Sequence, residues 1–122
     1  MDFVEEFTRD GKNFVYVDFS ELESDESYME RIKLTMPAIE KHPENSLYMI
    51  ANLDNVKFDS NTKKITADYI KSVKPYLRAA AIFGVDGIKK MMITTAMKTG
   101  GYVNTYFGFS KEQAIAWLLK QE

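Results

Sequence analysis

The sequence predicts an α/β protein with one mixed, mostly parallel sheet of about five strands and four helices, in the order β-β-α-β-α-β-α-β-α. Short apolar runs alternate along the 122 residues with segments in which apolar residues recur every three or four positions. Residue types that cap free helix amides stand where each helical segment begins. Strands that alternate with helices favour parallel pairing and right-handed crossovers.

The chain is expected to start with an antiparallel hairpin. Residues 2–8 and 13–19 are rich in aromatic residues and valine, which favour strands. Asp10-Gly11 lies between them and is a strong turn signal, because Gly accepts a positive φ.

A first helix is expected over 25–42, with Ser24 as its N-cap. Pro37 falls inside this segment and should kink the helix or split it. The apolar run 47–53 that follows has the length and composition of a strand covered on both faces.

The second half predicts further strand–helix units. A second helix opens in the polar stretch 59–62 and is expected to end before Pro75, and 78–85 reads as another buried strand. Residues 102–109 predict a short strand. Ser110 and Gln113 predict a capping box for the last helix.

A third helix is expected over 86–101. Its spacing places Ile88, Met92 and Ala96 on the inward face, and Gly100-Gly101 should stop the helix. No repeat or linker divides the chain, so we expect one domain over residues 1–122.

Composition excludes several classes of function. The formal net charge is −2 and sixteen basic residues are spread among eighteen acidic ones, so no basic face predicts nucleic-acid binding. The absence of cysteine removes disulfides, thiolate nucleophiles and cysteine metal sites. The longest apolar runs are far shorter than the ~20 residues that span a bilayer. The first residues lack a signal-peptide pattern, so we expect a cytoplasmic protein without a membrane span.

No catalytic constellation is visible. His42 is the sole histidine and falls in a helix-end loop, so no histidine metal site or nucleophile–histidine set is expected. Neither a dinucleotide fingerprint nor a P-loop occurs. Eighteen acids leave many carboxylate pairings open, and no spacing selects one. We therefore expect no enzyme activity, metal or cofactor.

Two helix starts are candidate ligand sites, because ligands of open parallel sheets bind beyond the carboxyl ends of the strands and helix amides attract anions. The alternative at each helix start is an N-cap that only satisfies the free backbone amides. At the start of the third helix, Asp86 itself is expected to be that cap. The candidate ligand- or anion-binding residues are Asp59, Ser60, Gly84, Gly87, Lys89 and Lys90.

Methionine and aromatic residues gather in the second half of the chain. Met91, Met92 and Met97 form a cluster on the third helix, and Met29, Met36 and Met49 lie elsewhere. Soft side chains of this kind can line a pocket, and Met91 and Met92, with Tyr102 and Tyr106 around the last strand, are candidates for an apolar pocket or an interface. The alternative is that these side chains are simply core.

Four stretches together resemble a known family: YVDFSEL (16–22), FDSNTKK (58–64), KPYLRAAAIFGVDGIKKMM (74–92) and FSKEQAIAWL (109–118). The chain resembles the SpoIIAA-like family of the STAS superfamily, including members described as STAS/SEC14-like. The resemblance covers most of the chain from about Tyr16 onward. It implies a single STAS-like domain of five strands and four helices, usually without enzymatic activity.

The resemblance implies two modes of action. STAS antagonists are switched by phosphorylation of a serine in a motif like Asp-Ser-Ser-Gly at the start of the second helix. This chain keeps Asp59 and Ser60 but has Asn61 and Thr62 where the second serine and the glycine would stand, which leaves Ser60 and Thr62 as candidate acceptors. SpoIIAA-like members instead suggest a small, lipid-like ligand in an apolar pocket, or action through dimers.

The favoured hypothesis is a non-catalytic regulatory module that binds a small apolar ligand or a protein partner and forms a homodimer. It predicts a hydrophobic cavity or an exposed apolar patch near the third helix and the last strand. The alternative is a phosphorylation-switched antagonist that acts on a partner kinase. A small enzyme with carboxylates and lysines in a cleft is a third class, and no sequence feature favours it.

Overall fold

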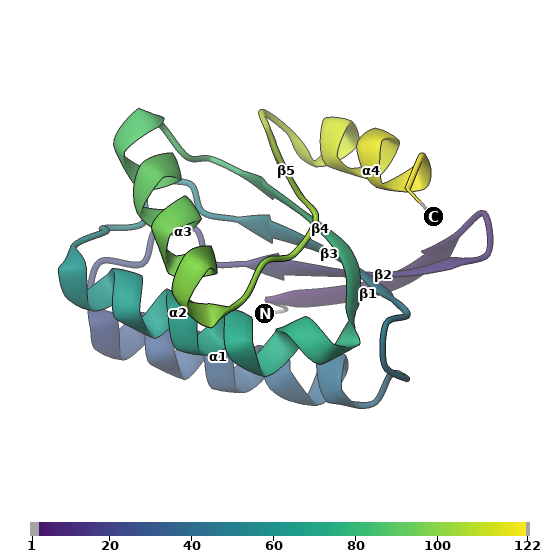
Figure 1. The fold of residues 1–122 in the computed structure, drawn as a ribbon, viewed down its shortest axis with the longest axis horizontal. Helices are drawn as coiled ribbons and strands as arrows, with labels where there is room; N and C mark the ends of the chain where they lie inside the picture. The colour runs from purple at the N-terminus through teal and green to yellow at the C-terminus, as the bar shows by residue number, and fades with distance from the viewer. Residues whose placement is uncertain (1–2, 122) are drawn as a thin grey trace.

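Helices and strands alternate after an initial hairpin (Figure 1). A computed structural model describes residues 3–121. The strands are β1 (Val4–Arg9), β2 (Lys12–Asp18), β3 (Leu47–Asn52), β4 (Leu77–Phe83) and β5 (Thr105–Gly108). The helices are α1 (Asp25–Glu40), α2 (Ser60–Val73), α3 (Gly87–Gly100) and α4 (Lys111–Leu119), and a short 3₁₀ turn covers Lys74–Tyr76.

The sheet runs in the order β1-β2-β3-β4-β5. β1 and β2 pair antiparallel across the turn, whereas every other neighbouring pair is parallel. The predicted α/β class and order of elements are therefore confirmed. β1 and β5 form the two edges of the sheet.

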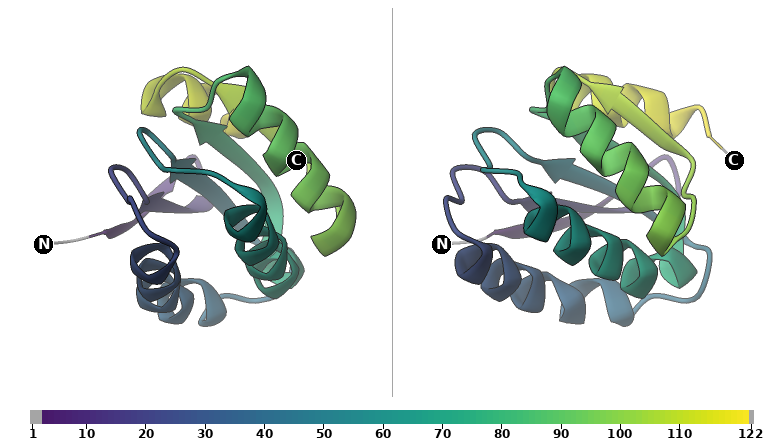
Figure 2. Two further views of the ribbon diagram at one scale, coloured as in Figure 1. Left: turned by 90° about the vertical axis from the view of Figure 1, so that its left-hand side faces the viewer. Right: turned by 60° about the vertical axis from the view of Figure 1, so that its left-hand side comes forward.

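The three layers are unequal (Figure 2). α1, α2 and α3 cover one face of the sheet, and α4 covers part of the other. Alternate residues of β3 serve the two cores: Met49 and Ala51 face α1–α3, while Tyr48 and Ile50 face α4. The central strands are buried on both sides, as their apolar runs predict.

Polar contacts join the hairpin to the last helix. The Lys12 ammonium donates hydrogen bonds to the carbonyl oxygens of Leu119 (2.8 Å) and Gln121 (2.7 Å), at the end of α4. Lys111, at the start of the same helix, forms an ion pair with Glu5 of β1. Both ends of α4 are thus attached to the first two strands.

Pro37 does not split α1, which continues to Glu40. Because the proline lies near the C-terminal end, it removes one hydrogen bond from the helix and little of the helix follows it. In the second half, Leu77 opens β4 and β5 is confined to Thr105–Gly108. Ser110 caps α4, but the Gln113 side chain accepts from the Phe109 amide rather than the Ser110 amide.

The predicted inward face of α3 is partly wrong. Ile88 is 71% exposed, and the buried residues are Ile93, Ala96 and Met97. The reason lies at the other end of the helix: a Cβ on Gly100 would come within 2.3 Å of the Ala67 carbonyl oxygen in α2. The closest approach to α2 is therefore at the C-terminal end of α3, and the first turn remains at the surface.

Candidate functional site

The start of α2 is a complete helix cap. The Asp59 carboxylate accepts hydrogen bonds from the backbone amides of Asn61 and Thr62, each at 3.0 Å. The Asp59 amide donates in turn to the Thr62 hydroxyl at 3.2 Å. The hydrogen bond from the Thr62 amide lowers the pKa of Asp59 most, and the hydrogen bond from the Thr62 hydroxyl lowers it further. Asp59 rather than Ser60 is the capping residue, and its carboxylate occupies the amides that an anion would use.

The same cap is bonded to the start of α1. Asp25 accepts hydrogen bonds from the Asn61 side-chain amide (2.6 Å) and the Thr62 hydroxyl (2.8 Å). Thr62 is 1% exposed, so this candidate acceptor is inaccessible to a kinase without local unfolding. Ser60 is exposed, and its hydroxyl has no hydrogen bond within residues 3–121.

At the start of α3, the two predicted lysines point to different places. Asp86 caps the helix by accepting from the Lys89 amide at 3.1 Å. The Lys89 ammonium donates to the carbonyl oxygens of Leu53 (3.2 Å) and Gly84 (3.4 Å), where β3 and β4 have ended. The Lys90 ammonium instead lies 5.1 Å from the centre of the Phe107 ring. These residues do not form one anion site.

The two predicted glycines have unequal roles. Gly84 has a φ of +83°, and a Cβ there would lie 2.5 Å from the Asp54 amide nitrogen, so close packing of two strand ends requires glycine. A Cβ at Gly87 would meet nothing within 4 Å. The hollow beside Gly84, of about 360 Å³, contains Asp54, Asp86 and Lys89. Its two carboxylates disfavour an anion.

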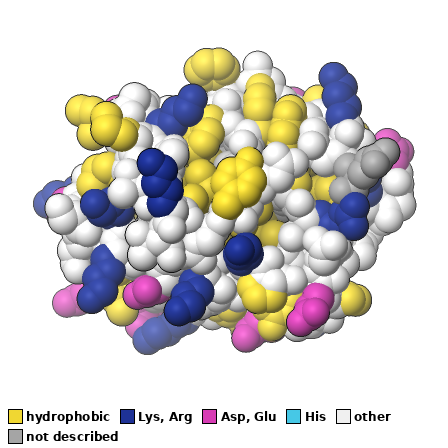
Figure 3. All heavy atoms as spheres, in the orientation of Figure 1, with side chains coloured by type: hydrophobic (Ala, Val, Ile, Leu, Met, Phe, Trp, Pro, Cys, Tyr) yellow, Lys and Arg dark blue, Asp and Glu magenta, His cyan; other side chains and the backbone are white. Residues whose placement is uncertain are grey.

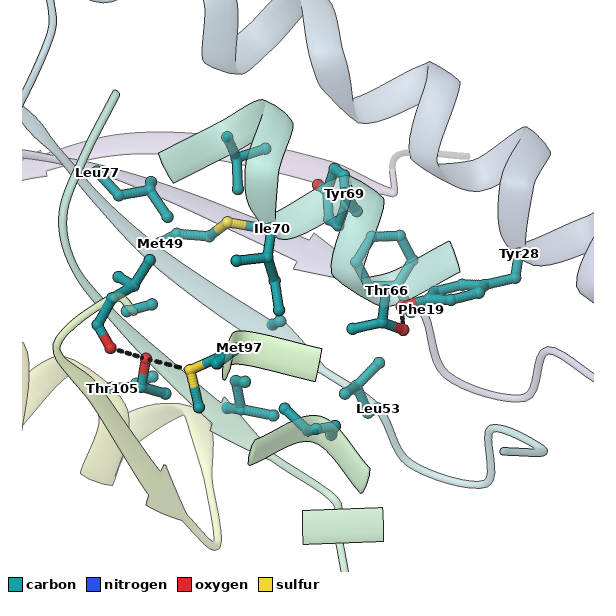
Figure 4. A pocket seen from close by; sticks show the side chains of 17 residues that line it. Phe19, Tyr28, Met49, Leu53, Thr66, Tyr69, Ile70, Leu77, Met97 and Thr105 are labelled. Atoms are coloured by element: carbon teal, nitrogen blue, oxygen red, sulfur yellow. Dashed lines mark hydrogen bonds between the residues drawn. The ribbon is translucent and has the colours of Figure 1, made fainter. Parts of the chain in front are cut away.

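An apolar cavity of about 70 Å³ lies between the sheet and the α2–α3 pair (Figure 4). Strands β3 and β4 form its floor, and α2, α3 and the segment that enters β5 form its walls. Its lining residues are Phe19, Tyr28, Met49, Ala51, Leu53, Thr66, Tyr69, Ile70, Val73, Leu77, Ala80, Ala81, Ile82, Ile93, Met97, Val103 and Thr105.

The tyrosines of the cavity are neutral hydrogen-bond donors. Thr66 donates its hydroxyl proton to the Thr62 carbonyl, so the Tyr28 hydroxyl, 2.9 Å away, donates to Thr66. By the same reasoning Tyr69 donates to Thr35 at 2.7 Å, because Thr35 donates to a carbonyl of its own helix. Burial raises the pKa of Tyr28 to about 12 and raises the pKa of Tyr69 as well. The cavity therefore contains no charged side chain.

None of the four residues predicted as an apolar pocket lines this cavity. Met91 and Tyr102 are exposed, because they lie on the outer side of α3 and in the loop after it. Tyr106 stacks on Trp117, on the opposite face of the sheet, at a ring distance of 5.3 Å. Met92 is half-buried outside the lining. As interface residues the four stay a prediction.

The methionines that line the cavity are Met49 and Met97, which the sequence singles out as flexible side chains but which are not among the four pocket candidates. A signal for the helical part of the lining existed in the three- and four-residue spacing from Thr66 to Val73 and from Ile93 to Met97. That spacing marks the inward faces of two neighbouring helices, but it does not reveal a gap between them.

The order of strands, with three helices on one face and one on the other, defines the STAS fold. A solved structure described as an anti-sigma-factor antagonist (STAS) domain protein from Planctomyces limnophilus matches with a TM-score of 0.58. The match covers 94% of this chain and 97% of that one at 12% identity, so it establishes the fold. No protein-family profile matches the chain, and no curated protein sequence matches it significantly.

Residues 3–121 contain no helix that is long and apolar enough to cross a bilayer. Within the same residues, His, Asp and Glu side chains do not gather in any group of three that could hold a metal ion.

Proposed function

We propose that the chain is a non-catalytic regulatory module of STAS fold that binds a small apolar ligand in the cavity beneath α2 and α3. The cavity carries this proposal. The side chains around this cavity of about 70 Å³ would gain van der Waals contacts with a ligand that fills it. Such a ligand would stabilise the folded state by binding to it.

The size and polarity of the cavity limit the ligand. An engineered apolar cavity of about 150 Å³ admits benzene, and this one has about half that volume. It therefore accommodates a short apolar segment, such as the end of a chain, unless the wall moves. Because its hydroxyls already donate to protein oxygens, the deep part offers little to a polar group.

The two carboxylates with shifted pKa values, Glu6 and Asp59, have structural partners and lie outside the lining of the cavity. Hydrogen bonding from Lys41, with a further contribution from His42, lowers the pKa of Glu6 at the surface. Helix amides lower the pKa of Asp59. Both groups are thus held as structural anions, whereas a general acid needs a raised pKa.

Methionine methyl NMR can test the proposal with 1-octanol as the probe, because the end of its chain is a short apolar segment of the kind the cavity accommodates. We expect 1-octanol to shift the methyl signals of Met49 and Met97 and to leave that of the exposed Met29 unchanged. Ala80→Val, which adds atoms at the cavity wall, should weaken the response. Ala79→Val, on the face covered by α4, serves as the control. Unchanged Met49 and Met97 signals at saturating probe would contradict the proposal.

A second function is favoured by the exposed hydroxyl of Ser60 at the first position of α2. A phosphate there would add about −1.5 to −2 charge beside two carboxylates, Asp59 and Asp25, and would loosen the contact between α1 and α2. Treatment with Mg-ATP and extract of the source cells, followed by mass spectrometry, tests it. Phosphate on Ser60 and not on the exposed Ser72 is expected, and an unmodified Ser60 would exclude this function.

A homodimer is the third part of the proposal, with Met91 and Tyr102 as candidate contacts because both are exposed. Sedimentation velocity of the wild type and of Met91→Lys/Tyr102→Ser tests it. The wild type should sediment as a dimer and the double variant as a monomer. A wild-type monomer at all concentrations would refute it.

A further inference from the structure

The cavity approaches the surface between α3 and β5. Three of its lining residues, Ile70, Ile82 and Thr105, are half-buried rather than buried. Ile82 and Thr105 lie on the neighbouring strands β4 and β5, on the side covered by α3. The Thr105 hydroxyl lies 3.5 Å from the Met97 sulfur across the gap (Figure 4). Sulfur is a weak acceptor, so this contact can open at small cost.

Apolar side chains continue from this gap to the surface. Figure 3 shows hydrophobic side chains gathered over β5 and between α3 and α4, with Lys and Arg side chains among them. Phe107 is the neighbour of Ile82 in the β4–β5 register and is half-buried. An apolar path therefore runs from the cavity past Ile82 to Phe107.

A positive charge stands at the outer end of the path. The ammonium of Lys90 lies 5.1 Å from the centre of the Phe107 ring, and the side chain is exposed. Lys90 forms no ion pair with any residue in the range 3–121. Lys89, its neighbour, uses its ammonium on backbone carbonyls and is not at the gap.

We propose that the ligand is a single-chain amphiphile with a carboxylate head, held by Lys90 at the gap while its apolar tail enters between α3 and β5. This inference rests on the proposed ligand-binding function. The tail matches the uncharged cavity. The head must stay outside, because burying an unpaired carboxylate in that cavity would be costly. The ammonium over Phe107 supplies the complementary charge where the apolar path ends.

The tail of a medium-length ligand exceeds about 70 Å³, so its entry requires a displacement of α3. Two features permit this movement. Met97 is flexible and adapts its shape to a chain beside it. The pair of atoms that spans the gap, Thr105 Oγ1 and Met97 Sδ, is separable without breaking a strong hydrogen bond.

The inference can be tested with decanoate and 1-decanol, which have the same chain length and differ in their head group. Their dissociation constants are measured by following the Met97 methyl signal in an NMR titration. The wild type should bind decanoate about 5-fold more tightly than decanol, the preference expected of a surface ion pair worth up to about 1 kcal/mol. Lys90→Gln should remove this preference. Lys98→Gln, on the last turn of the same helix, should retain it.

Two outcomes would overturn the role of Lys90 and leave the proposed ligand binding in the cavity standing. The first is that the wild type binds decanoate and decanol with equal affinity, and the second is that Lys90→Gln and Lys98→Gln lose the preference for decanoate equally. If neither these probes nor 1-octanol shifts the Met49 and Met97 signals, the proposed function fails together with the inference. Lys90 is exposed, so Lys90→Gln should fold normally, and circular dichroism checks this.

Discussion

α2 and α3 lie side by side on one face of the sheet, yet they are attached to the molecule in different ways. Each has 14 residues, follows a buried parallel strand and starts with a capping aspartate. The cap of α2 is bonded to Asp25 at the start of α1, whereas the cap of α3 bonds to its own first turn. α2 buries five side chains and α3 buries three. Within residues 3–121, the first turn of α3 reaches the strand ends only through the Lys89 ammonium. We therefore expect α2 to be the more firmly held wall of the cavity and α3 the more mobile one.

The largest expected effect comes from the point where the two helices touch. Gly100→Ala places a Cβ against the backbone carbonyl of Ala67, which cannot move without its helix. We expect a loss of about 3 kcal/mol in the free energy of unfolding, the upper range for overpacking. Gly87→Ala, with open space around its new methyl group, should be neutral or stabilising by up to about 1 kcal/mol. Urea unfolding of both variants measures the difference, and equal losses would contradict this picture of the contact.

A second pair of variants compares a threonine of each helix. Thr62→Val removes the buried hydroxyl that donates to Asp25, so we expect a loss of about 2 kcal/mol, as for hydrogen bonds to charged groups. Thr94→Val removes an exposed hydroxyl that bonds to the Lys90 carbonyl of its own helix and should change stability by less than about 0.5 kcal/mol. Urea unfolding of the two threonine variants measures both losses. A similar cost at both positions would mean that α2 is no more firmly attached than α3.

Hydrogen exchange tests the mobility of α3 directly. We expect the amides of Ile93 and Ala96 to exchange about tenfold faster than those of Ala67 and Tyr69, a difference of about 1.4 kcal/mol in local opening. The measurement uses native-state exchange followed by NMR. Identical protection in the two helices would remove the case for a movable wall.

The smallest effect concerns acid stability. The folded pKa of Asp59 is lowered, so its contribution to stability is present above the unfolded pKa and is lost as the pH falls through the folded value. Asp59→Asn keeps a good N-cap at neutral pH. Its melting temperature should therefore fall less than that of the wild type between about pH 5 and about pH 2. Parallel curves would show that this carboxylate is not linked to folding.

The sequence was sufficient for the fold because its signals are local. Helix caps, periodicity and the Asp10-Gly11 turn each act within a few residues, and each element they predict is present. The errors lie where packing decides. The inward face of α3 depends on where Gly100 meets α2, a contact between residues 33 positions apart, counting from Ala67 to Gly100.

The candidate site was less accessible to sequence reasoning. Asp59 and Ser60 were identified as a helix start, but the hydrogen bonds that Asn61 and Thr62 donate to Asp25 join separate helices and leave no local pattern. Met91, Met92 and Met97 stood out as a cluster, and of these three Met97 alone lines the cavity. A cavity is a failure of complementary side chains to fill space, and no single segment encodes it.

The attachment of Lys12 to the end of α4 has a consequence for synthesis of the protein on the ribosome. Its acceptors, the carbonyls of Leu119 and Gln121, are made more than a hundred residues after the lysine itself. Until they emerge, one apolar side of the sheet, including Phe14, Tyr48 and Ile50, has no helix to cover it. Any part of the sheet that forms before residues 111–119 have been made therefore exposes this apolar face, as partly folded chains often do.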